Sequence, residues 1–213
     1  MGVAFILAFV LVGLAELGDK SQLLLLGFAA KYRPAKVLAG AAVAILLLQA
    51  ASVLLGRAVG TFVPGGIVSV AAGLLFIIFG IVTWRGADDE GSGEADGRTF
   101  TLGPILTVAA ALLLAEFGDK TQLMTVSIAA DPAAALRTLG SVASGIKAPE
   151  AGSTATALGV WLGSSAGFLA ADALAIVIGA VLGARLPRRA IARFSAVVFV
   201  VFGSVTLAST FVV

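Results

Sequence analysis

Two short motifs place acidic side chains inside segments that are otherwise apolar. Glu-Leu-Gly-Asp-Lys-Ser spans residues 16–21 within the apolar run 3–30, and Glu-Phe-Gly-Asp-Lys-Thr spans residues 116–121 within the run 101–130. A charge at the centre of a membrane helix costs about 2.5–3.5 kcal/mol, so acids in such segments require a counter-charge or a function. We expect the four carboxylates to converge on one divalent cation. The expected metal ligands are Glu16, Asp19, Glu116 and Asp119.

Helical geometry places these groups on a common face. At 100° per residue, Asp19 lies about 60° from Glu16, Lys20 lies about 40° away on the other side, and Gln22 continues the stripe. The alternative is a local ion pair, in which Lys20 neutralises one carboxylate and the motif only joins the two halves. That pair accounts for one acid of each motif and leaves the other unexplained.

The glycine of each motif permits close helix approach or local unwinding, which would free backbone carbonyls as further oxygen ligands. Ser21 and Thr121 can be ligands only if the helix unwinds. Otherwise they bond back to their own backbone, which is the alternative we favour.

Two further polar residues lie in the helices that follow the motif helices. Asp172 aligns with Gln49, 123 residues earlier. A role beside the site or in a proton path and simple interhelical hydrogen bonding are both open for this pair. The residues expected to support the site or carry protons are Lys20, Ser21, Gln22, Lys120, Thr121, Gln122, Gln49 and Asp172.

The donor set restricts the ion. Cysteine and histidine are both absent, so the site offers oxygen only, which suits calcium, manganese or magnesium, and magnesium gives up its water least readily. With acids and lysines ionised, the twin motifs total −2, which one divalent ion cancels. Without the ion, crowded carboxylates take up protons. Cation and protons then compete for one site, which under alternating access gives antiport. We expect no enzyme activity and no resident cofactor.

The composition requires a lipid environment for the segments that carry the motifs. Of 213 residues 60% are hydrophobic and only 26 are charged, with a mean hydropathy of +1.10, so a soluble enzyme is excluded. The basic residues lie in short loops, which excludes a nucleic-acid partner. The sequence predicts an all-α polytopic membrane protein of about six helices. The apolar runs are 3–30, 37–59, 65–84, 101–130, 156–184 and 190–213.

The chain repeats itself. The motifs recur at an offset of 100 residues, and later glycines and a proline recur at an offset of 123, which implies an insertion of 23 residues. We expect this insertion, which lies around 131–155, to be an external loop without chemistry. Two copies of a three-helix unit must lie in opposite orientations, as in secondary transporters. The expected organisation is a first repeat at 1–85, an acidic cytoplasmic linker at 86–100 and a second repeat at 101–213.

Basic residues set the orientation. An external N-terminus places nine lysines and arginines on the cytoplasmic side and three outside, so both termini are expected outside the cytoplasm of a bacterial-type inner (cell) membrane. The start of the chain has no basic region or cleavage pattern, so we interpret it as part of a retained helix, not a signal peptide.

The paired motifs resemble the twin Glu-x-Gly-Asp-Lys/Arg-Ser/Thr signatures of the transmembrane protein 165 family of Golgi manganese/calcium transporters and their bacterial and plastid relatives. The resemblance covers the whole chain, although the long 131–155 segment departs from the compact family pattern. It implies exchange of manganese or calcium for protons, with manganese export as the commonest bacterial role. The family's essential acids fall on Glu16, Asp19, Glu116 and Asp119.

Two other functions remain open from the sequence. A cation channel would use carboxylate rings to select ions without proton coupling. A small-solute exporter would use the motifs only as structure, and then Glu116→Gln would lower the amount of protein without changing cation tolerance.

Overall fold

The computed structural model describes residues 1–17, 19–63, 65–86, 103–182 and 188–211. Every regular element within these ranges is helical, which confirms the all-α class. The acidic segment expected to link the two halves, 86–100, lies outside the described residues except for its first position. The helices are α1 (Gly2–Glu16), α2 (Lys20–Lys31), α3 (Pro34–Phe62), α4 (Gly65–Gly86), α5 (Pro104–Glu116), α6 (Lys120–Ala130), α7 (Pro132–Arg137), α8 (Thr154–Leu182) and α9 (Arg188–Phe211), with a 3₁₀ turn at Gly140–Ala143.

Two helices in the described part of the chain are long and apolar enough to cross a membrane. They are Pro34–Phe62 and the stretch Thr154–Val177 of α8, each with half of its most apolar window buried within the protein. The helices Gly2–Glu16 and Pro104–Glu116 are shorter but also apolar. A membrane protein of this kind satisfies its backbone polar groups within helices, so the helical fold and the apolar composition agree.

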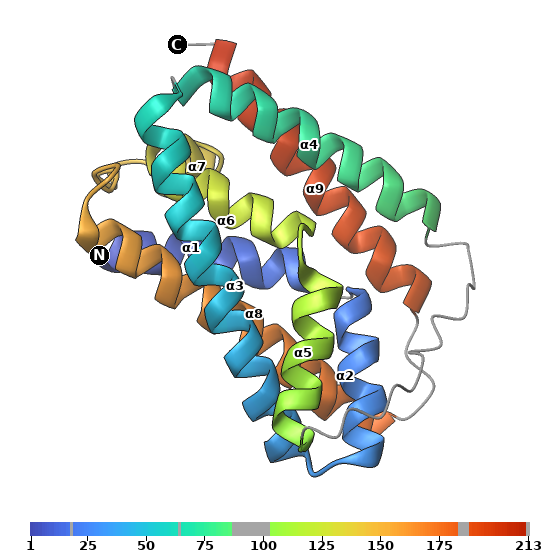
Figure 1. The fold of residues 1–213 in the computed structure, drawn as a ribbon. Coiled ribbons are helices and arrows are strands. Elements are labelled where there is room, and N and C mark those ends of the chain that lie inside the picture. The colour runs from blue at the N-terminus through green and yellow to red at the C-terminus, as the bar shows by residue number, and fades with distance from the viewer. Residues whose placement is uncertain (18, 64, 87–102, 183–187, 212–213) are drawn as a thin grey trace.

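Small residues allow the helices to approach closely. α1 lies along α8, α3 contacts α5 and α6, and α4 lies along α9 (Figure 1). A Cβ atom added at Gly159 would lie 2.6 Å from the Met1 carbonyl oxygen, and one at Gly60 would lie 2.6 Å from the Ala130 carbonyl oxygen. Close backbone approach of this kind is the main source of helix association in lipid, where burial of apolar surface drives little.

The structure corrects two sequence expectations. The runs 3–30 and 101–130 are not continuous helices: each divides at its motif, into α1 and α2 and into α5 and α6. The insertion 131–155 is not only a loop, because it contains α7 and the 3₁₀ turn. Ala135, Leu136 and Ala143 of this segment belong to the buried core. Its alanine-rich sequence lacks the length of a spanning run but is apolar enough to pack against the helices.

Candidate metal centre

Each motif lies between two half-helices and has the same backbone hydrogen bond from its aspartate to its glutamate. The first glutamate is the last residue of its half-helix, Glu16 in α1 and Glu116 in α5. The Asp19 N–H donates to the Glu16 carbonyl oxygen at 3.2 Å, and the Asp119 N–H donates to the Glu116 carbonyl oxygen at 3.1 Å. The turn ends the first half-helix so that the glutamate and aspartate are no longer related by ideal helical geometry. The common face calculated for an unbroken helix therefore does not apply.

Glycine makes the second break possible. Gly118 has a φ of +80°, a left-handed conformation that residues with a Cβ atom rarely adopt. Gly18, its counterpart, lies outside the described residues. The unwinding that the sequence allowed at the motif glycines is thus present at Gly118.

The motif glutamines bind the backbone of the breaks. The Gln22 side-chain amide donates to the Glu16 carbonyl oxygen at 3.0 Å and to the Ala171 carbonyl oxygen at 3.4 Å. The Gln122 side-chain oxygen accepts a hydrogen bond from the Gly118 N–H at 2.7 Å. A broken helix leaves polar groups without intrahelical partners, and these side chains replace them. Both glutamines, expected beside the site, therefore act on the backbone that holds it.

The carboxylates of the two motifs meet. Oxygen atoms of Glu16, Asp19 and Glu116 all lie within 4.8 Å of one another, which is close enough for one metal ion to contact all three. Glu16 is fully buried and Glu116 is 3% exposed. The Oε2 atom of each glutamate has no hydrogen-bond partner in the described part of the protein. Asp119, the fourth expected ligand, is not one of this group of three, although it lies beside Asp19.

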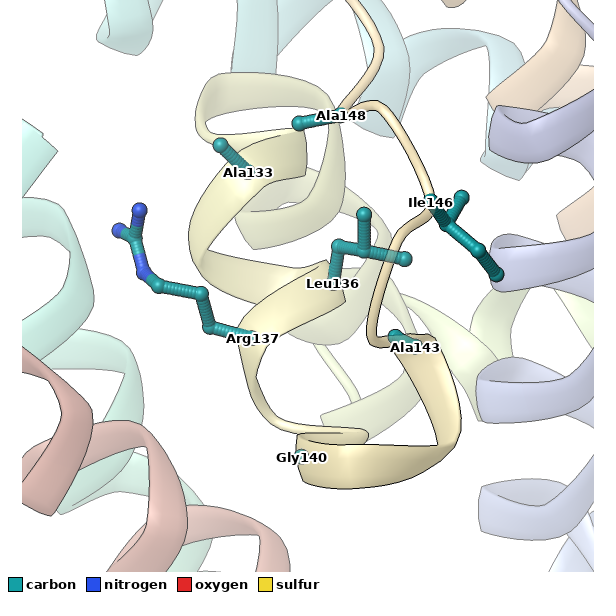
Figure 2. Close-up of a pocket in the computed structure, with 7 residues that line it drawn as sticks. All are labelled: Ala133, Leu136, Arg137, Gly140, Ala143, Ile146 and Ala148. Carbon is teal, nitrogen blue, oxygen red and sulfur yellow. The ribbon is translucent and has the colours of Figure 1, made fainter.

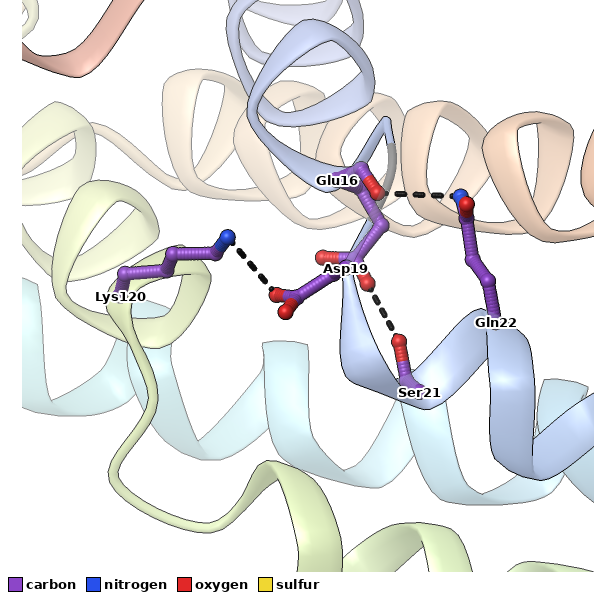
Figure 3. Close-up of polar contacts among 5 residues, drawn as sticks. All are labelled: Glu16, Asp19, Ser21, Gln22 and Lys120. Atoms are coloured by element: carbon purple, nitrogen blue, oxygen red, sulfur yellow. Dashed lines mark hydrogen bonds and ion pairs between the residues drawn. The ribbon is translucent and has the colours of Figure 1, made fainter. Parts of the chain in front are cut away.

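An ion pair also joins the two motifs. The Lys120 Nζ atom lies 3.0 Å from Asp19 Oδ2, and the two side chains are 6% and 13% exposed. Figure 3 shows the lysine extending from the second motif to the aspartate of the first. The local pairing considered from the sequence was within one motif, whereas this pair crosses between them. The side chain of Lys20 lies outside the described residues.

The motif hydroxyls do not follow the backbone pattern that we favoured from the sequence. The Ser21 hydroxyl donates to Glu16 Oε1 at 2.7 Å, across the break between α1 and α2 (Figure 3). The Thr121 hydroxyl is buried and makes no hydrogen bond within the described residues. That expectation assumed an unbroken helix and is wrong for both residues. The break turns Ser21 towards the carboxylates.

The polar pair on the following helices is fully enclosed. Asp172 is 0% exposed, and neither of its carboxylate oxygens has a hydrogen-bond partner among the described residues. Its charge lies within interaction range of Glu16 and Asp19. Gln49 is 1% exposed, and its side-chain oxygen is likewise without a partner there. Asp172 therefore makes no interhelical hydrogen bond through its carboxylate within the described part of the chain, which was one of the two interpretations left open.

A cavity elsewhere lacks the chemistry of this centre. It lies in the segment that contains α7 and the 3₁₀ turn, and it measures about 280 Å³. Figure 2 shows that Arg137 is its charged lining residue, among apolar side chains such as Leu136 and Ile146. Because none of the residues that line it is acidic, it offers no carboxylate to a cation.

Comparison with known proteins gives one family. The profile of a family described as divalent cation/proton antiporter GDT1 matches residues 4–91 and 151–212, so the first motif lies inside the matched ranges and the second lies between them. Protein PAM71, chloroplastic, from Arabidopsis thaliana is 30% identical over 233 residues, which cover 96% of this chain and 56% of that protein.

Two other relatives differ in coverage. GDT1-like protein 3 from Arabidopsis thaliana is 24% identical over 92% of this chain and 67% of its own length. A putative manganese exporter from Vibrio cholerae is 35% identical over 59% of this chain and 61% of its own length. The chain thus spans between about half and two thirds of these relatives. No solved structure matches.

Proposed function

The chain belongs to the GDT1 family of divalent cation/proton antiporters, and from this premise we propose that it carries Mn²⁺, or Ca²⁺, out of the cytoplasm in exchange for protons. The observation that carries the proposal is the meeting of Glu16, Asp19 and Glu116 oxygens within 4.8 Å. These residues come from motifs 100 positions apart, so their convergence is a property of the fold and not of local sequence. The name of the Vibrio cholerae relative, a putative manganese exporter, supports the choice of Mn²⁺.

The donors suit a hard cation. Carboxylate oxygens bind Ca²⁺ and Mn²⁺, and the chain contains no cysteine or histidine that would favour softer metals. Asp119 and Asp172 would complete the coordination or lie just outside it, since both are within interaction range of Asp19. The ion is cargo in this proposal, so the site must bind it reversibly.

Burial supplies the coupling to protons. Carboxylates removed from water are costly as unpaired anions, and either a bound cation or bound protons relieves that cost. Glu16, Glu116 and Asp172 are all at most 3% exposed, so these acids need one occupant or the other. Two exclusive occupants of one site, exposed to each side of the membrane in turn, give exchange. The titration belongs to the cluster and not to one residue.

The proposed architecture is six spans in two inverted repeats. The first repeat contains α1 with α2, α3 and α4, and the second contains α5 with α6, α8 and α9. The helix contacts support this assignment because equivalent helices of the two repeats make equivalent contacts. α1 contacts α8 in the same way that its counterpart α5 contacts α3, and α2 contacts α8 in the same way that its counterpart α6 contacts α3. Discontinuous helices at the interface of such repeats form the substrate site in many transporters. In this proposal the membrane is a bacterial-type cell membrane, with both termini outside the cytoplasm.

Flux in proteoliposomes tests the proposal. With Mn²⁺ and Ca²⁺ competing and a pH gradient imposed, an exchanger moves the cation against the proton flow, and it acidifies or alkalinises the lumen when only the cation gradient is present. A channel would pass the cation without any pH change, and that result would replace antiport with conduction.

Matched variants test the site. Asp19→Asn and Asp119→Asn keep the size of each side chain while removing its charge, and both are expected to abolish exchange. Transport at the parent rate by both would refute the assignment. The solute-exporter alternative predicts instead that Glu116→Gln lowers only the amount of protein.

A further inference from the structure

The ion pair between the motifs places a positive charge on a proposed metal ligand. Lys120 begins α6, and its ammonium group lies 3.0 Å from Asp19 Oδ2. The lysine side chain is 6% exposed, so its charge is enclosed with the carboxylate and is weakly screened by water.

In the proposed site, Asp19 would face two positive groups, the Lys120 ammonium and the bound cation. One of its carboxylate oxygens lies within 4.8 Å of the Glu16 and Glu116 oxygens that form the proposed cation site with it. A divalent ion bound to these three oxygens would lie within a few ångströms of the Lys120 ammonium if the ion pair stayed in place. Like charges repel in inverse proportion to their separation, and repulsion is strong where the effective dielectric constant is low. Repulsion between the two groups therefore makes each bind Asp19 less tightly when the other is present.

We propose that Lys120 competes with the transported cation for Asp19, so that cation binding displaces the lysine and moves the start of α6. This inference rests on the proposed function and adds a regulating residue to its site. Lys120 is then a specificity-determining residue: it sets the affinity for the cation from within the protein. A monovalent ion gains less than a divalent one at the same carboxylates, so the competition with Lys120 selects against it.

The position of Lys120 in the chain also links occupancy to conformation. It directly follows Asp119, in the turn where Gln122 accepts a hydrogen bond from the Gly118 N–H. A lysine that leaves Asp19 no longer joins this turn to the first motif. The bound cation and the ion pair thus favour different arrangements of the two motifs, which is the differential interaction that a conformational change requires.

Equilibrium binding of Mn²⁺ to purified protein, at one pH, tests the competition with two variants. Lys120→Met removes the charge and keeps the length, and we expect it to bind Mn²⁺ at least about tenfold more tightly than the parent, or ~1.4 kcal/mol. Lys120→Arg holds a carboxylate with two parallel hydrogen bonds, so it should bind Mn²⁺ several-fold more weakly. Lys147 is an exposed lysine of the 131–155 segment, so Lys147→Met is the matched control and should bind Mn²⁺ as tightly as the parent does.

The order of affinities decides the outcome. Competition is supported if Lys120→Met binds Mn²⁺ more tightly than the parent and the parent binds it more tightly than Lys120→Arg. A structural ion pair predicts the reverse, since arginine would preserve the site and methionine would damage it, and that order would overturn the inference. Should Lys120→Met not fold, the arginine variant still decides, because unchanged Mn²⁺ affinity in Lys120→Arg also overturns it. If the parent exchanges no cation in proteoliposomes, the proposed function itself fails, which is a separate result.

Discussion

Close packing between α3 and α5 should control the position of Glu116. A Cβ atom added at Gly40 would lie 2.6 Å from the Ile105 carbonyl oxygen and 2.7 Å from Val108 Cβ, whereas ordinary contacts begin at 3.4 Å. Since one of these atoms is backbone, Gly40→Ala must move the two helices apart by about 0.8 Å, the difference between 3.4 and 2.6 Å. Overpacking of this kind costs about 1–3 kcal/mol. A displacement near 1 Å at a reacting or binding group lowers function by about 100-fold.

The assay is the initial rate of Mn²⁺/proton exchange, normalised to reconstituted protein, beside the thermal midpoint in detergent. Gly27→Ala is the matched control, because Gly27 also lies within a helix but nothing lies within 4 Å of an added Cβ. We expect Gly40→Ala to melt lower and to exchange 10- to 100-fold more slowly, with Gly27→Ala at the parent rate. Parent-like behaviour of Gly40→Ala, or equal damage in both variants, would refute the packing argument.

Three further outcomes follow from the geometry of the motifs. Ser21→Ala removes the donor to Glu16 and should weaken Mn²⁺ binding by about tenfold at fixed pH, measured by titration; unchanged affinity would count against the contact. Gly118→Ala should lower stability by about 1–2 kcal/mol because of its φ of +80°, although an added Cβ meets nothing within 4 Å; an unshifted or raised thermal midpoint would argue against this conformation. Apparent Mn²⁺ affinity should weaken as the pH on the binding side falls from about 8 to 6, because protons compete for the same carboxylates, and a pH-independent affinity would contradict that competition.

The sequence predicts the helical class and the identity of the acidic cluster because both depend on composition and charge cost. Burying a carboxylate in an apolar segment is unfavourable enough that two matched motifs indicate a shared site. The structure brings the carboxylates of Glu16 and Glu116 together as expected, and their role as metal ligands stays a prediction. The six-span inverted architecture stays a prediction.

What the sequence did not predict depends on backbone conformation. The motif glycine indicates that a break in the helix is possible. Only the turn itself lets the Ser21 hydroxyl donate to the Glu16 carboxylate and lets Gln22 and Gln122 bond to backbone groups at the breaks. The pairing of Lys120 with Asp19 was missed because a lysine beside an aspartate in sequence suggests a local contact. Long-range packing decides instead which carboxylate the lysine reaches. The same holds for 131–155, where Ala135, Leu136 and Ala143 become buried only against other helices.

Equilibrium binding of Mn²⁺ to the parent, to Glu16→Gln and to Glu116→Gln shows whether the two motifs share one ion. The two carboxylates belong to different motifs and, in a shared site, bind the same ion. We expect one Mn²⁺ bound per parent chain and loss of that ion, or at least about 100-fold weaker binding, in either variant. Two ions bound per parent chain, with each variant losing one and keeping the other at unchanged affinity, would contradict a shared site.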